Sequence, residues 1–556
     1  MLPRLALPPS RLVIAILALA FVAPGLVGHD PWRAFDVIAI EITHQMHLTG
    51  DWIVPRLAGE PWLDDPPFFH WLALAFAKAF GGLLGFHNAA RLASGMATMT
   101  ALYFLYLAAR HAVPPNADLA VRRAAGAAAT LLVIGSLGLI VHAHEAVPDL
   151  AALAASCAAF FFLMTSERKP VKAGLGFGAA LGVAFLSTGL VMPAVVGAAA
   201  LVAHLACDEW RTPKAPRFLG AALAAFVVVG ASWPAALALR APGLAQDWWY
   251  GATHARGEFL DNLRYYLKTA SWFAWPAWPL AGWAVWTLRK EWRTPRVIVP
   301  LAAALLALPA VAWGGPQQDI NAMVLLAPLA LLGAHGVAHL RRGAANALDW
   351  FGVMTFSFFA VLVWVGYVAM SSGLPPRLAA NFAKLAPGFS ARFDLLPFLA
   401  ALALTLAWLY LAFFTAPSPT RGVTRWAAGV TLLWGTVATL WLPWVDHIRS
   451  YRSVALQIKS TLPANAGCIA ASELAAPQRA AFSFHAGLVT RPQTLVPAGP
   501  PPTATGSVAV PACRYLIVQG HPLFENPPGP GWRKLADVGR PGDRGERYRL
   551  YRFQPG

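Results

Sequence analysis

Long runs of apolar residues, separated by short polar stretches, occupy the chain as far as about residue 444. A helix of roughly 20 apolar residues can cross the hydrocarbon core of a bilayer, and it pairs its own backbone hydrogen-bonding groups there. The expected fold class is therefore a polytopic α-helical membrane protein. The pattern predicts about thirteen transmembrane helices, at 11–27, 89–110, 122–141, 147–165, 173–187, 188–206, 217–239, 270–288, 296–314, 320–340, 349–371, 394–415 and 424–444.

Two apolar stretches allow other interpretations. Pro67–Gly85 is long enough to be a further span, but its prolines, polar residues and paired glycines favour an amphipathic helix in the membrane interface. Residues 11–27 also fit the apolar core of a signal peptide. We expect this first helix to be retained, because its removal would lose the agreement between the spans and the charge of the loops.

Charged residues are distributed unevenly between alternate loops. If the N-terminus is cytoplasmic, Lys and Arg greatly outnumber acids in the loops on that side, whereas the opposite loops are rich in acids. This is the positive-inside pattern. An odd number of spans then exports the chain from about residue 445. We therefore expect a multi-pass protein of the bacterial inner (plasma) membrane with a periplasmic C-terminal domain.

The composition agrees with this class. Of the 556 residues, 57% are hydrophobic and 12% are charged, and 23 are Trp, which excludes a set of ordinary soluble domains. The net charge of +17 needs no nucleic-acid partner, because basic loops orient the protein and attract anionic membrane lipids.

The chain changes character after residue 445. Short alternating or apolar runs, such as CRYLIVQG and RYRLYRF, are separated by turns rich in Pro and Gly. They predict a small α/β domain over 445–556, with residues 1–444 as the transmembrane domain. Cys468 and Cys513 both lie in the exported part, where an oxidising compartment permits a disulfide. Two separate buried thiols are the alternative.

The longest loop between predicted spans, 28–88, gathers acids in a chain that is otherwise poor in them. A short helix over Asp36–Leu48 is predicted, followed by turns at prolines and glycines. Carboxylates on the outer side of a membrane suit general-base chemistry, although acids before two prolines also suit a helix cap. The loop holds six carboxylates: Asp36, Glu41, Asp51, Glu60, Asp64 and Asp65.

Two further outer loops carry candidate site residues. Asp149 opens the helix predicted at 147–165 and follows three other polar residues: His142, His144 and Glu145. The loop over about 240–269 holds three candidate cations: His254, Arg256 and Arg264. Such cations could meet a phosphate, and the arginines could equally extend to lipid head groups.

The first outer loop contains the run Gly50–Pro55, which reads GDWIVP, together with Glu41, Pro66 and the pair His70–Trp71 at set distances. This pattern resembles the lipid-linked sugar transferases of the GT-C superfamily, above all the aminoarabinose transferase (ArnT) and protein mannosyltransferase branch. Arg91, at the start of the next helix, fits as well. The resemblance implies a GT-C fold with an outer C-terminal domain.

Several positions depart from the family pattern. Phe35 stands where the family carries its catalytic Asp, and Asp36 stands where it carries the following Glu. Asp64 matches the Glu of a Glu-Lys-Pro motif, but Asp65 replaces its Lys. Thr188 replaces the Lys of a Lys-Gly pair. A shift of one residue would let Asp36 act as the base.

The resemblance implies a glycosyltransferase that moves a sugar from a polyprenyl (undecaprenyl) phosphate donor to lipid A, another envelope glycan or a protein on the periplasmic side. Asp36 is the expected base, supported by Glu41. A divalent metal ion held by acids of the site is an alternative source of the positive charge that the leaving phosphate needs. The expected substrate-binding residues are Asp64, Asp65, Asp149, Arg56, His254, Arg256 and Arg264, of which the three aspartates are the candidate metal ligands.

Two other functions stay open. Phe35, Asp65 and Thr188 would fit a family member that has lost catalysis and instead binds polyprenyl lipid or scaffolds envelope assembly. A transporter is the second, although the chain has no apparent repeated halves and few charges deep in its spans.

Overall fold

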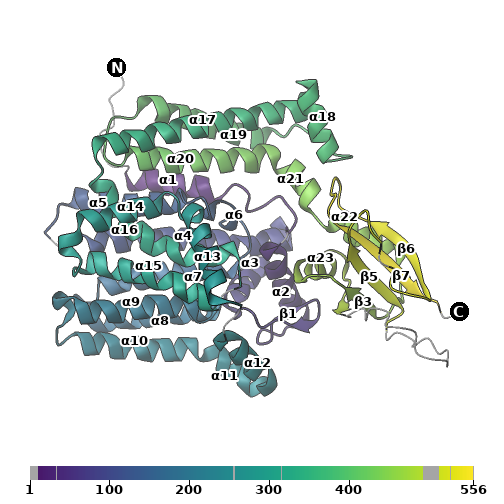
Figure 1. The fold of residues 1–556 in the computed structure, drawn as a ribbon, viewed down its shortest axis with the longest axis horizontal. Coiled ribbons are helices and arrows are strands. Elements are labelled where there is room, and N and C mark those ends of the chain that lie inside the picture. The colour runs from purple at the N-terminus through teal and green to yellow at the C-terminus, as the bar shows by residue number, and fades with distance from the viewer. Residues whose placement is uncertain are drawn as a thin grey trace.

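The computed structural model describes residues 10–32, 34–114, 116–254, 257–314, 316–492, 513–525 and 527–554. In these ranges the chain folds into a helical body and a smaller C-terminal sheet flanked by helices (Figure 1). The first half of the body contains α1 (Arg11–Val22), α2 (Phe35–Thr49), α3 (Phe68–Leu84), α4 (Phe86–Ala112), α5 (Leu119–Ile134), α6 (Leu139–His142), α7 (Pro148–Met164), α8 (Pro170–Thr188), α9 (Val191–Ala206), α10 (Ala215–Gly230), α11 (Ser232–Arg240) and α12 (Pro242–Thr253), with the short helix η1 (Asp208–Trp210) and the two-residue strands β1 (Arg56–Leu57) and β2 (Glu60–Pro61).

The second half of the body contains α13 (Phe259–Phe273), α14 (Ala277–Thr287), η2 (Arg289–Glu291), α15 (Pro295–Gly314), η3 (Asp319–Leu325), α16 (Leu326–Ala338), α17 (Arg342–Ser372), α18 (Pro376–Leu385), α19 (Leu395–Phe414), α20 (Arg421–Thr436), η4 (Val437–Trp441) and α21 (Leu442–Arg449). The C-terminal region adds α22 (Arg452–Thr461), β3 (Ile469–Ser472), α23 (Ala476–Ala486), β4 (Thr490–Pro492), β5 (Tyr515–Gly520), β6 (Trp532–Val538) and β7 (Arg547–Phe553).

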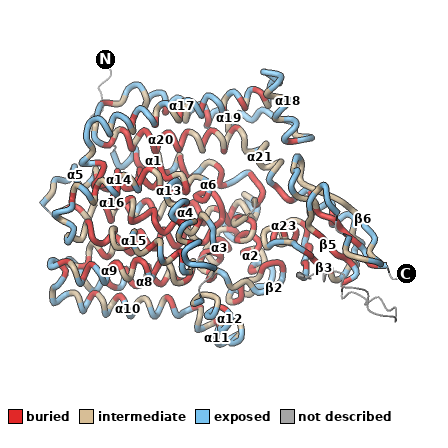
Figure 2. Tube along the Cα trace, viewed as in Figure 1, coloured by how far each residue is buried: buried red, intermediate tan, exposed pale blue. Residues whose placement is uncertain are grey.

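The helical body is layered. In Figure 1, α17, α19 and α20 run along one side and α8, α9 and α10 along the other, with the remaining long helices between them. The inner helices are buried, whereas α10, α17 and α19 are exposed along much of their length (Figure 2). Only 11% of the apolar window of α19 is buried, against 89% for the η3–α16 segment. Outer helices that are both apolar and exposed are suited to lipid contact.

Small residues bring the inner helices close together. A Cβ atom added at Gly178 on α8 would lie 1.9 Å from the carbonyl oxygen of Ala222 on α10. One added at Gly336 on α16 would lie 2.0 Å from that of Leu280 on α14. Small side chains that let backbones approach are typical of helix packing in membranes. The hydrophobic effect contributes little to helix association there, so close van der Waals contact matters more. These glycines therefore fix the spacing of the body.

The structure agrees with a multi-pass membrane protein, but it departs from several predicted spans. Eight helices in the described ranges are long and apolar enough to cross a membrane, and α1, α3, α7 and α9 are shorter apolar helices, so the count of thirteen stays a prediction. The predicted helix 270–288 is broken between Phe273 and Ala277, because Pro276 cannot donate a helical hydrogen bond. The loop helix predicted at Asp36–Leu48 is α2, which ends at Gly50 with a φ of 69°.

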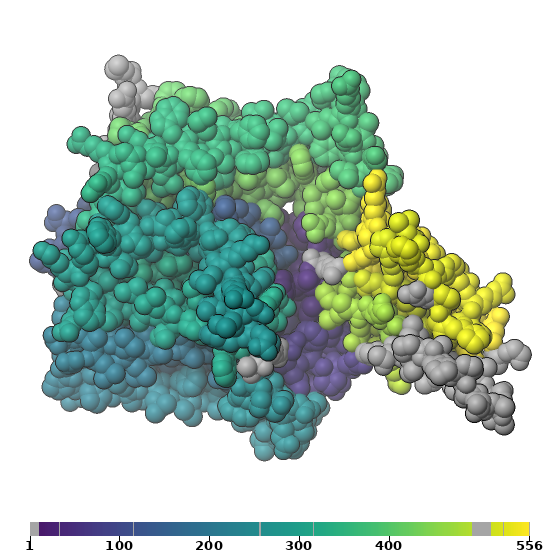
Figure 3. Space-filling model, viewed as in Figure 1, coloured from purple at the N-terminus to yellow at the C-terminus, as the bar shows by residue number. Residues whose placement is uncertain are grey.

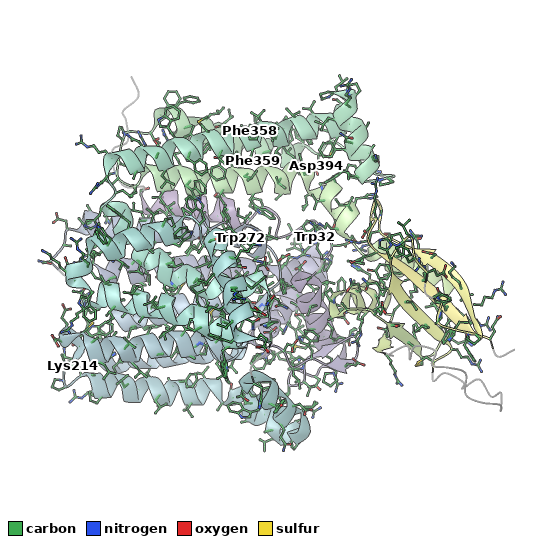
Figure 4. The ribbon with its side chains drawn as sticks, viewed as in Figure 1. Trp32, Lys214, Trp272, Phe358, Phe359 and Asp394 are labelled. Atoms are coloured by element: carbon green, nitrogen blue, oxygen red, sulfur yellow. A yellow bond between two sulfur atoms is a disulfide. The ribbon has the colours of Figure 1, made fainter. Side chains whose placement is uncertain are left out.

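Two labelled residues show where a pair of loops predicted for opposite sides of the membrane lie. Lys214, in a loop expected to be cytoplasmic, lies at the end of the helical body far from the sheet, whereas Asp394, in a loop expected to be periplasmic, lies toward the sheet (Figure 4). Phe358 and Phe359 of α17 lie on the outer layer of the body and are 59% and 42% exposed. These two loops therefore lie at opposite ends of the helical body.

The C-terminal region folds around a five-stranded sheet in the order β4-β3-β5-β7-β6. β3 pairs in parallel with β4 and β5, while β7 pairs antiparallel with β5 and β6. Apolar residues of β5 and β7 pack with Phe482 of α23 and Val454 of α22 in one buried cluster. Cys468 and Cys513 form a disulfide, with Cα atoms 5.0 Å apart and a separation of 45 positions in the chain.

Charged and polar side chains join the sheet region to the body. Arg452, at the start of α22, donates its Nε to Asp30 Oδ2 at 2.8 Å, and Ser450 donates its hydroxyl to the same carboxylate at 2.6 Å. The indole Nε1 of Trp32 donates to Asp446 Oδ1 at 2.8 Å. Helix α23 packs on α2 through the same buried cluster that fills the space beneath the sheet. The loop before α2 is therefore held from both sides.

Loss of the disulfide is expected to destabilise the sheet region. In the loop-entropy account, closing 45 residues stabilises the folded state by about 3–4 kcal/mol. The Cys468→Ser/Cys513→Ser double variant should lower the melting temperature of the sheet region, measured by scanning calorimetry in detergent. Dithiothreitol should lower the wild-type transition and leave the variant unchanged. An equal effect of the reductant on both would contradict the assignment, because Cys157 and Cys207 are free.

Candidate functional site

A cavity of about 450 Å³ lies where the helical body meets the C-terminal region. Its walls come from α2, the loop before α3, the first turns of α7 and α9, α12, α15, η3 and the start of α23. Figure 3 shows a recess on the same flank of the molecule, where the purple N-terminal elements are visible between the teal helices and the yellow strands. The cavity is therefore built from segments that lie far apart in the sequence.

Three carboxylates from two distant segments line this cavity. Asp64 and Asp65 come from the loop between β2 and α3, where Pro66 and Pro67 end the loop and α3 begins at Phe68. Asp149 is the second residue of α7, directly after Pro148. Asp64 is exposed, and Asp65 and Asp149 are partly exposed. The structure thus brings together three acids predicted for the site, on the wall of one open cavity.

The Gly50–Pro55 run folds the loop that carries these acids. Asp51 Oδ1 accepts hydrogen bonds from the backbone N–H groups of Ile53 and Val54, at 3.1 and 3.2 Å. Side chains then secure this turn from outside: Trp71 Nε1 donates to the carbonyl of Trp52, and Trp233 Nε1 donates to the carbonyl of Ile53, both at 2.8 Å. The motif therefore positions the loop and does not itself line the cavity.

Asp36 has a different environment from the one expected for a base. Its side chain is fully buried and forms an ion pair with Arg91 of α4 at 3.0 Å. It also accepts a hydrogen bond from the Ala146 N–H at 2.7 Å. Burial opposes its charge, but the Arg91 guanidinium outweighs that effect and holds the pKa of Asp36 below its usual value. Phe35, not Asp36, lines the cavity, so we revise the assignment and give Asp36 a structural part.

Glu41 also differs from its expected place. Its side chain is buried, its Oε1 accepts a hydrogen bond from Gln45 Nε2 at 2.7 Å, and its Oε2 lies 3.8 Å from His44 Nδ1. Glu41 does not line the cavity. Its partner Gln45 also contacts Ser483 of α23, so this part of α2 packs against the C-terminal region. We therefore assign Glu41 to the packing of α2.

The expected phosphate-binding cations lie away from the cavity. Arg56 Nη1 donates to the Gly59 carbonyl at 3.3 Å, within the β1–β2 turn. His254 is exposed and stacks on Tyr250 with ring centroids 3.7 Å apart, and Arg264 is exposed and pairs with Asp261. None of the three is a lining residue, and each instead contacts a residue close to it in the sequence. Arg256 lies outside the described residues.

A buried histidine stands behind the acidic wall. His142 Nδ1 lies 2.9 Å from Glu145 Oε2, its Nε2 lies 3.7 Å from Asp319 Oδ2, and its ring contacts Phe35 of the cavity wall. Burial opposes protonation, but the hydrogen bonds to Asp319 and Glu145 outweigh it and raise the pKa of His142 to about 10. A positive charge therefore lies beside Asp149 at neutral pH.

The His142 charge gives the protein a pH-dependent stability. A folded-state pKa near 10, against 6.5 for the unfolded chain, contributes stability that is complete below pH 6.5 and is lost as pH rises through 10. The difference in melting temperature between wild type and His142→Gln should therefore be widest near pH 6 and should shrink toward pH 10. The exposed His254→Gln serves as the control. A gap that grows with pH would contradict the assignment.

The predicted metal ion has no clear set of ligands. Among the described residues no three His, Cys, Asp or Glu side chains are grouped so as to hold a metal ion, although Asp64, Asp65 and Asp149 share the cavity. His144, two residues after His142, directs both ring nitrogens to the carbonyl groups of Ile140 and Phe21, each at 2.7 Å.

Sequence reasoning overlooked three polar residues that line the cavity as site residues: Trp62, His70 and Thr188. His70 and Thr188 had entered only as positions to compare with the family motif. Burial lowers the pKa of His70 to about 4, so its ring is neutral at physiological pH. Spacing in the sequence could place His70 on the first turns of a helix, but not against a cavity shared with α9.

The comparisons with known proteins agree with this architecture. The family model described as dolichyl-phosphate-mannose-protein mannosyltransferase matches residues 64–233. An undecaprenyl phosphate-α-4-amino-4-deoxy-L-arabinose arabinosyl transferase of Aeromonas salmonicida is 27% identical over 352 residues, which cover 58% of this chain and 60% of that protein. One from Serratia proteamaculans is 25% identical over 388 residues, 66% of each chain. The chain thus matches about three fifths of the length of the first of these relatives.

The structural likeness extends over nearly the whole chain. The crystal structure of ArnT from Cupriavidus metallidurans bound to undecaprenyl phosphate has a TM-score of 0.66 and 18% identity, and the match covers 97% of both chains. The fold is therefore the GT-C fold of membrane glycosyltransferases. In sequence and in fold the chain is similar to ArnT, which confirms the resemblance predicted from the first outer loop.

Proposed function

We propose that the protein is a glycosyltransferase that moves a sugar from undecaprenyl phosphate, or a related polyprenyl phosphate, to lipid A or another envelope acceptor at the periplasmic side of the inner membrane. The observation that carries this proposal is the convergence of Asp64, Asp65 and Asp149 on one cavity in an ArnT-like fold. Relatives that match the chain are named for transfer from this donor. In this account residues 1–444 form the membrane domain and 445–556 the periplasmic domain.

The acidic wall suits the acceptor side of the reaction. In an inverting transfer, the acceptor hydroxyl attacks the anomeric carbon while the bond to the polyprenyl phosphate breaks. A carboxylate that accepts the hydroxyl proton speeds this step, typically by 10²–10⁴-fold. We assign that role to Asp149, because it lines the cavity and is fixed on the first turn of α7. Asp64 and Asp65, on the facing loop, hold the hydroxyl groups of the acceptor.

The leaving phosphate needs positive charge, and helix starts can provide it. Residues at the beginnings of α7, α9 and α23 all line the cavity: Pro148, Val191 and Ala476. Unpaired N–H groups and the helix dipole give such ends a partial positive charge that favours phosphate. His142 lies behind the same wall, but Glu145 and Asp319 already balance its charge. The helix starts therefore take the place of the lysine that the family motif carries where this chain has Asp65.

The proposal is tested by transfer in a defined system. Purified protein in lipid nanodiscs, supplied with a polyprenyl-phosphate sugar and lipid A, should release polyprenyl phosphate and add the mass of one sugar to the acceptor. Envelope mass spectrometry of a deletion strain should show the loss of the same mass. A wild-type protein that binds the donor but releases no polyprenyl phosphate with any envelope acceptor would contradict the proposal.

One observation favours a second function. Phe35 lines the cavity at the position where the family pattern has its catalytic Asp. Its ring contacts the ring of His142. A chain that had lost catalysis would still bind polyprenyl phosphate there and scaffold envelope assembly. That protein would bind donor with equal affinity before and after Asp149→Asn, and neither form would transfer sugar.

A further inference from the structure

His70 lines the cavity and carries a buried ring nitrogen, Nε2, that has no hydrogen-bond partner among the described residues. The residue lies on the first turn of α3 and is 1% exposed. A buried polar atom without a partner costs free energy, and native proteins leave few of them. Such an atom beside a cavity indicates a ligand that completes the hydrogen bond.

The hydrogen bonds on the other side of the ring define what that ligand must be. The hydroxyl of Thr43 donates to the Ala39 carbonyl at 2.7 Å, so its oxygen can only accept from His70 Nδ1, which lies 3.3 Å away. Nδ1 therefore carries the proton of the neutral ring, and Nε2 is a bare acceptor. A phosphate or a carboxylate has no proton to donate to it. The group that meets Nε2 is a hydroxyl or an amine.

Two more unsatisfied polar atoms belong to residues of the same cavity. Trp62 Nε1, in the loop before α3, is a donor without a partner, and Thr188 Oγ1, at the end of α8, is a hydroxyl without one. Hydroxyl groups of a sugar both donate and accept, so a sugar carries the kinds of group that each of the three atoms requires. A polyprenyl chain can satisfy none.

We propose that Trp62, His70 and Thr188 form the subsite that holds the sugar or acceptor ring, with His70 Nε2 accepting a hydrogen bond from a substrate hydroxyl or amine. Trp62 donates to a substrate oxygen, and Thr188 fills the remaining position. This inference rests on the proposed transfer reaction and adds the residues that recognise its polar substrate. It also gives a role to Thr188, which replaces the lysine of the family's Lys-Gly pair.

Two substitutions at His70 separate recognition from structure. The amide of Gln can place an oxygen near the position of Nε2, whereas that of Asn reaches only the position of Nδ1. His70→Asn should therefore lower kcat/KM by about tenfold or more, the effect of one lost buried hydrogen bond, and His70→Gln should recover most of it. An effect on KM for the donor places the sugar at His70, and an effect on KM for the acceptor places the acceptor there. Wild-type rates in His70→Asn, or equal losses in both variants, would overturn the proposal.

Removal of Trp62 Nε1 or Thr188 Oγ1 should lower activity without lowering stability. Trp62→Phe and Thr188→Val delete polar atoms that have no partner in the free protein, so the melting temperature should stay level or rise while kcat/KM falls by about tenfold. Thr98→Val is the matched control, because Thr98 Oγ1 is also buried without a partner but lies on α4, outside the cavity. It should leave kcat/KM unchanged. A loss of melting temperature without a loss of kcat/KM in either cavity variant would overturn the assignment.

These outcomes are distinct from failure of the proposed reaction. If the wild-type protein transfers no sugar, the proposed function fails, and the subsite is then tested by binding of the polyprenyl-phosphate sugar against sugar-free polyprenyl phosphate. The subsite predicts that wild type prefers the sugar-bearing lipid by about tenfold or more and that His70→Asn loses this preference. Equal preference in the two proteins would overturn the subsite.

Discussion

Asp149→Asn is expected to lower kcat for sugar transfer by about 10²–10⁴-fold, the usual effect of removing a general base. Asn keeps the size of the side chain but cannot take the proton of the acceptor hydroxyl. KM for the polyprenyl-phosphate sugar should change little, because the donor contacts the helix starts and the polar subsite. The measurement is release of polyprenyl phosphate under single-turnover conditions in nanodiscs.

The matched control for this prediction is Asp261→Asn. Asp261 is an exposed acid on α13 that pairs with Arg264, and it does not line the cavity. Its replacement should leave kcat within about twofold of wild type, as expected for a surface position. If Asp149→Asn retained wild-type kcat while Asp64→Asn or Asp65→Asn lost it, the base would belong to the loop before α3. Full activity in all three would remove the acids from the chemistry.

Arg91→Met is expected to destabilise the protein by about 3–5 kcal/mol, the usual effect of leaving one member of a buried ion pair without its partner. Arg91 is fully buried, and it donates to Asp36 and to the carbonyl groups of Leu26 and His29. Its loss leaves the Asp36 carboxylate and these carbonyls unpaired inside the protein. The measurement is the melting temperature in detergent, together with the amount of protein in the membrane.

A double variant of Asp36 and Arg91 tests whether the unpaired charge causes this loss of stability. Asp36→Leu/Arg91→Met should be more stable than Arg91→Met, because the double variant leaves no buried charge unpaired. Arg110→Met, near the other end of α4, is the control and should change stability by less than about 0.5 kcal/mol. Asp36→Asn should then lose activity in step with folded protein, with kcat per folded molecule close to wild type. A folded Asp36→Asn protein with no transfer would return Asp36 to the chemistry.

The fold could be predicted in outline because lipid imposes strong constraints on sequence. Apolar length identified most of the long helices, and the breaks at prolines and glycines located α2 and α3 within a few residues. The helix predicted at 270–288 was interrupted, because a hydropathy pattern does not register the loss of hydrogen bonding at Pro276. The spacing of Cys468 and Cys513 permitted a disulfide without requiring one, and packing of the sheet brought the two residues together.

The sequence predicted site residues correctly only where the residue type is rare in the chain. An acid-poor chain drew attention to Asp64, Asp65 and Asp149, and these three share the cavity. The same reasoning could not separate Asp36 from them, because its partner Arg91 lies 55 positions away and its burial depends on how α2 meets α4. His70 entered only as part of a family motif and Trp62 gave no signal, since the importance of both comes from hydrogen bonds that the folded protein leaves unmade.

The most direct test of the central claim is a cryo-electron microscopy structure of the protein with a polyprenyl-phosphate sugar in nanodiscs. The account predicts density for the phosphate inside the cavity, between the first turns of α7 and α9, with the sugar ring against His70 and the acids facing it. A phosphate bound elsewhere on the helical body, with the cavity of Asp64, Asp65 and Asp149 empty or filled only by water, would contradict it.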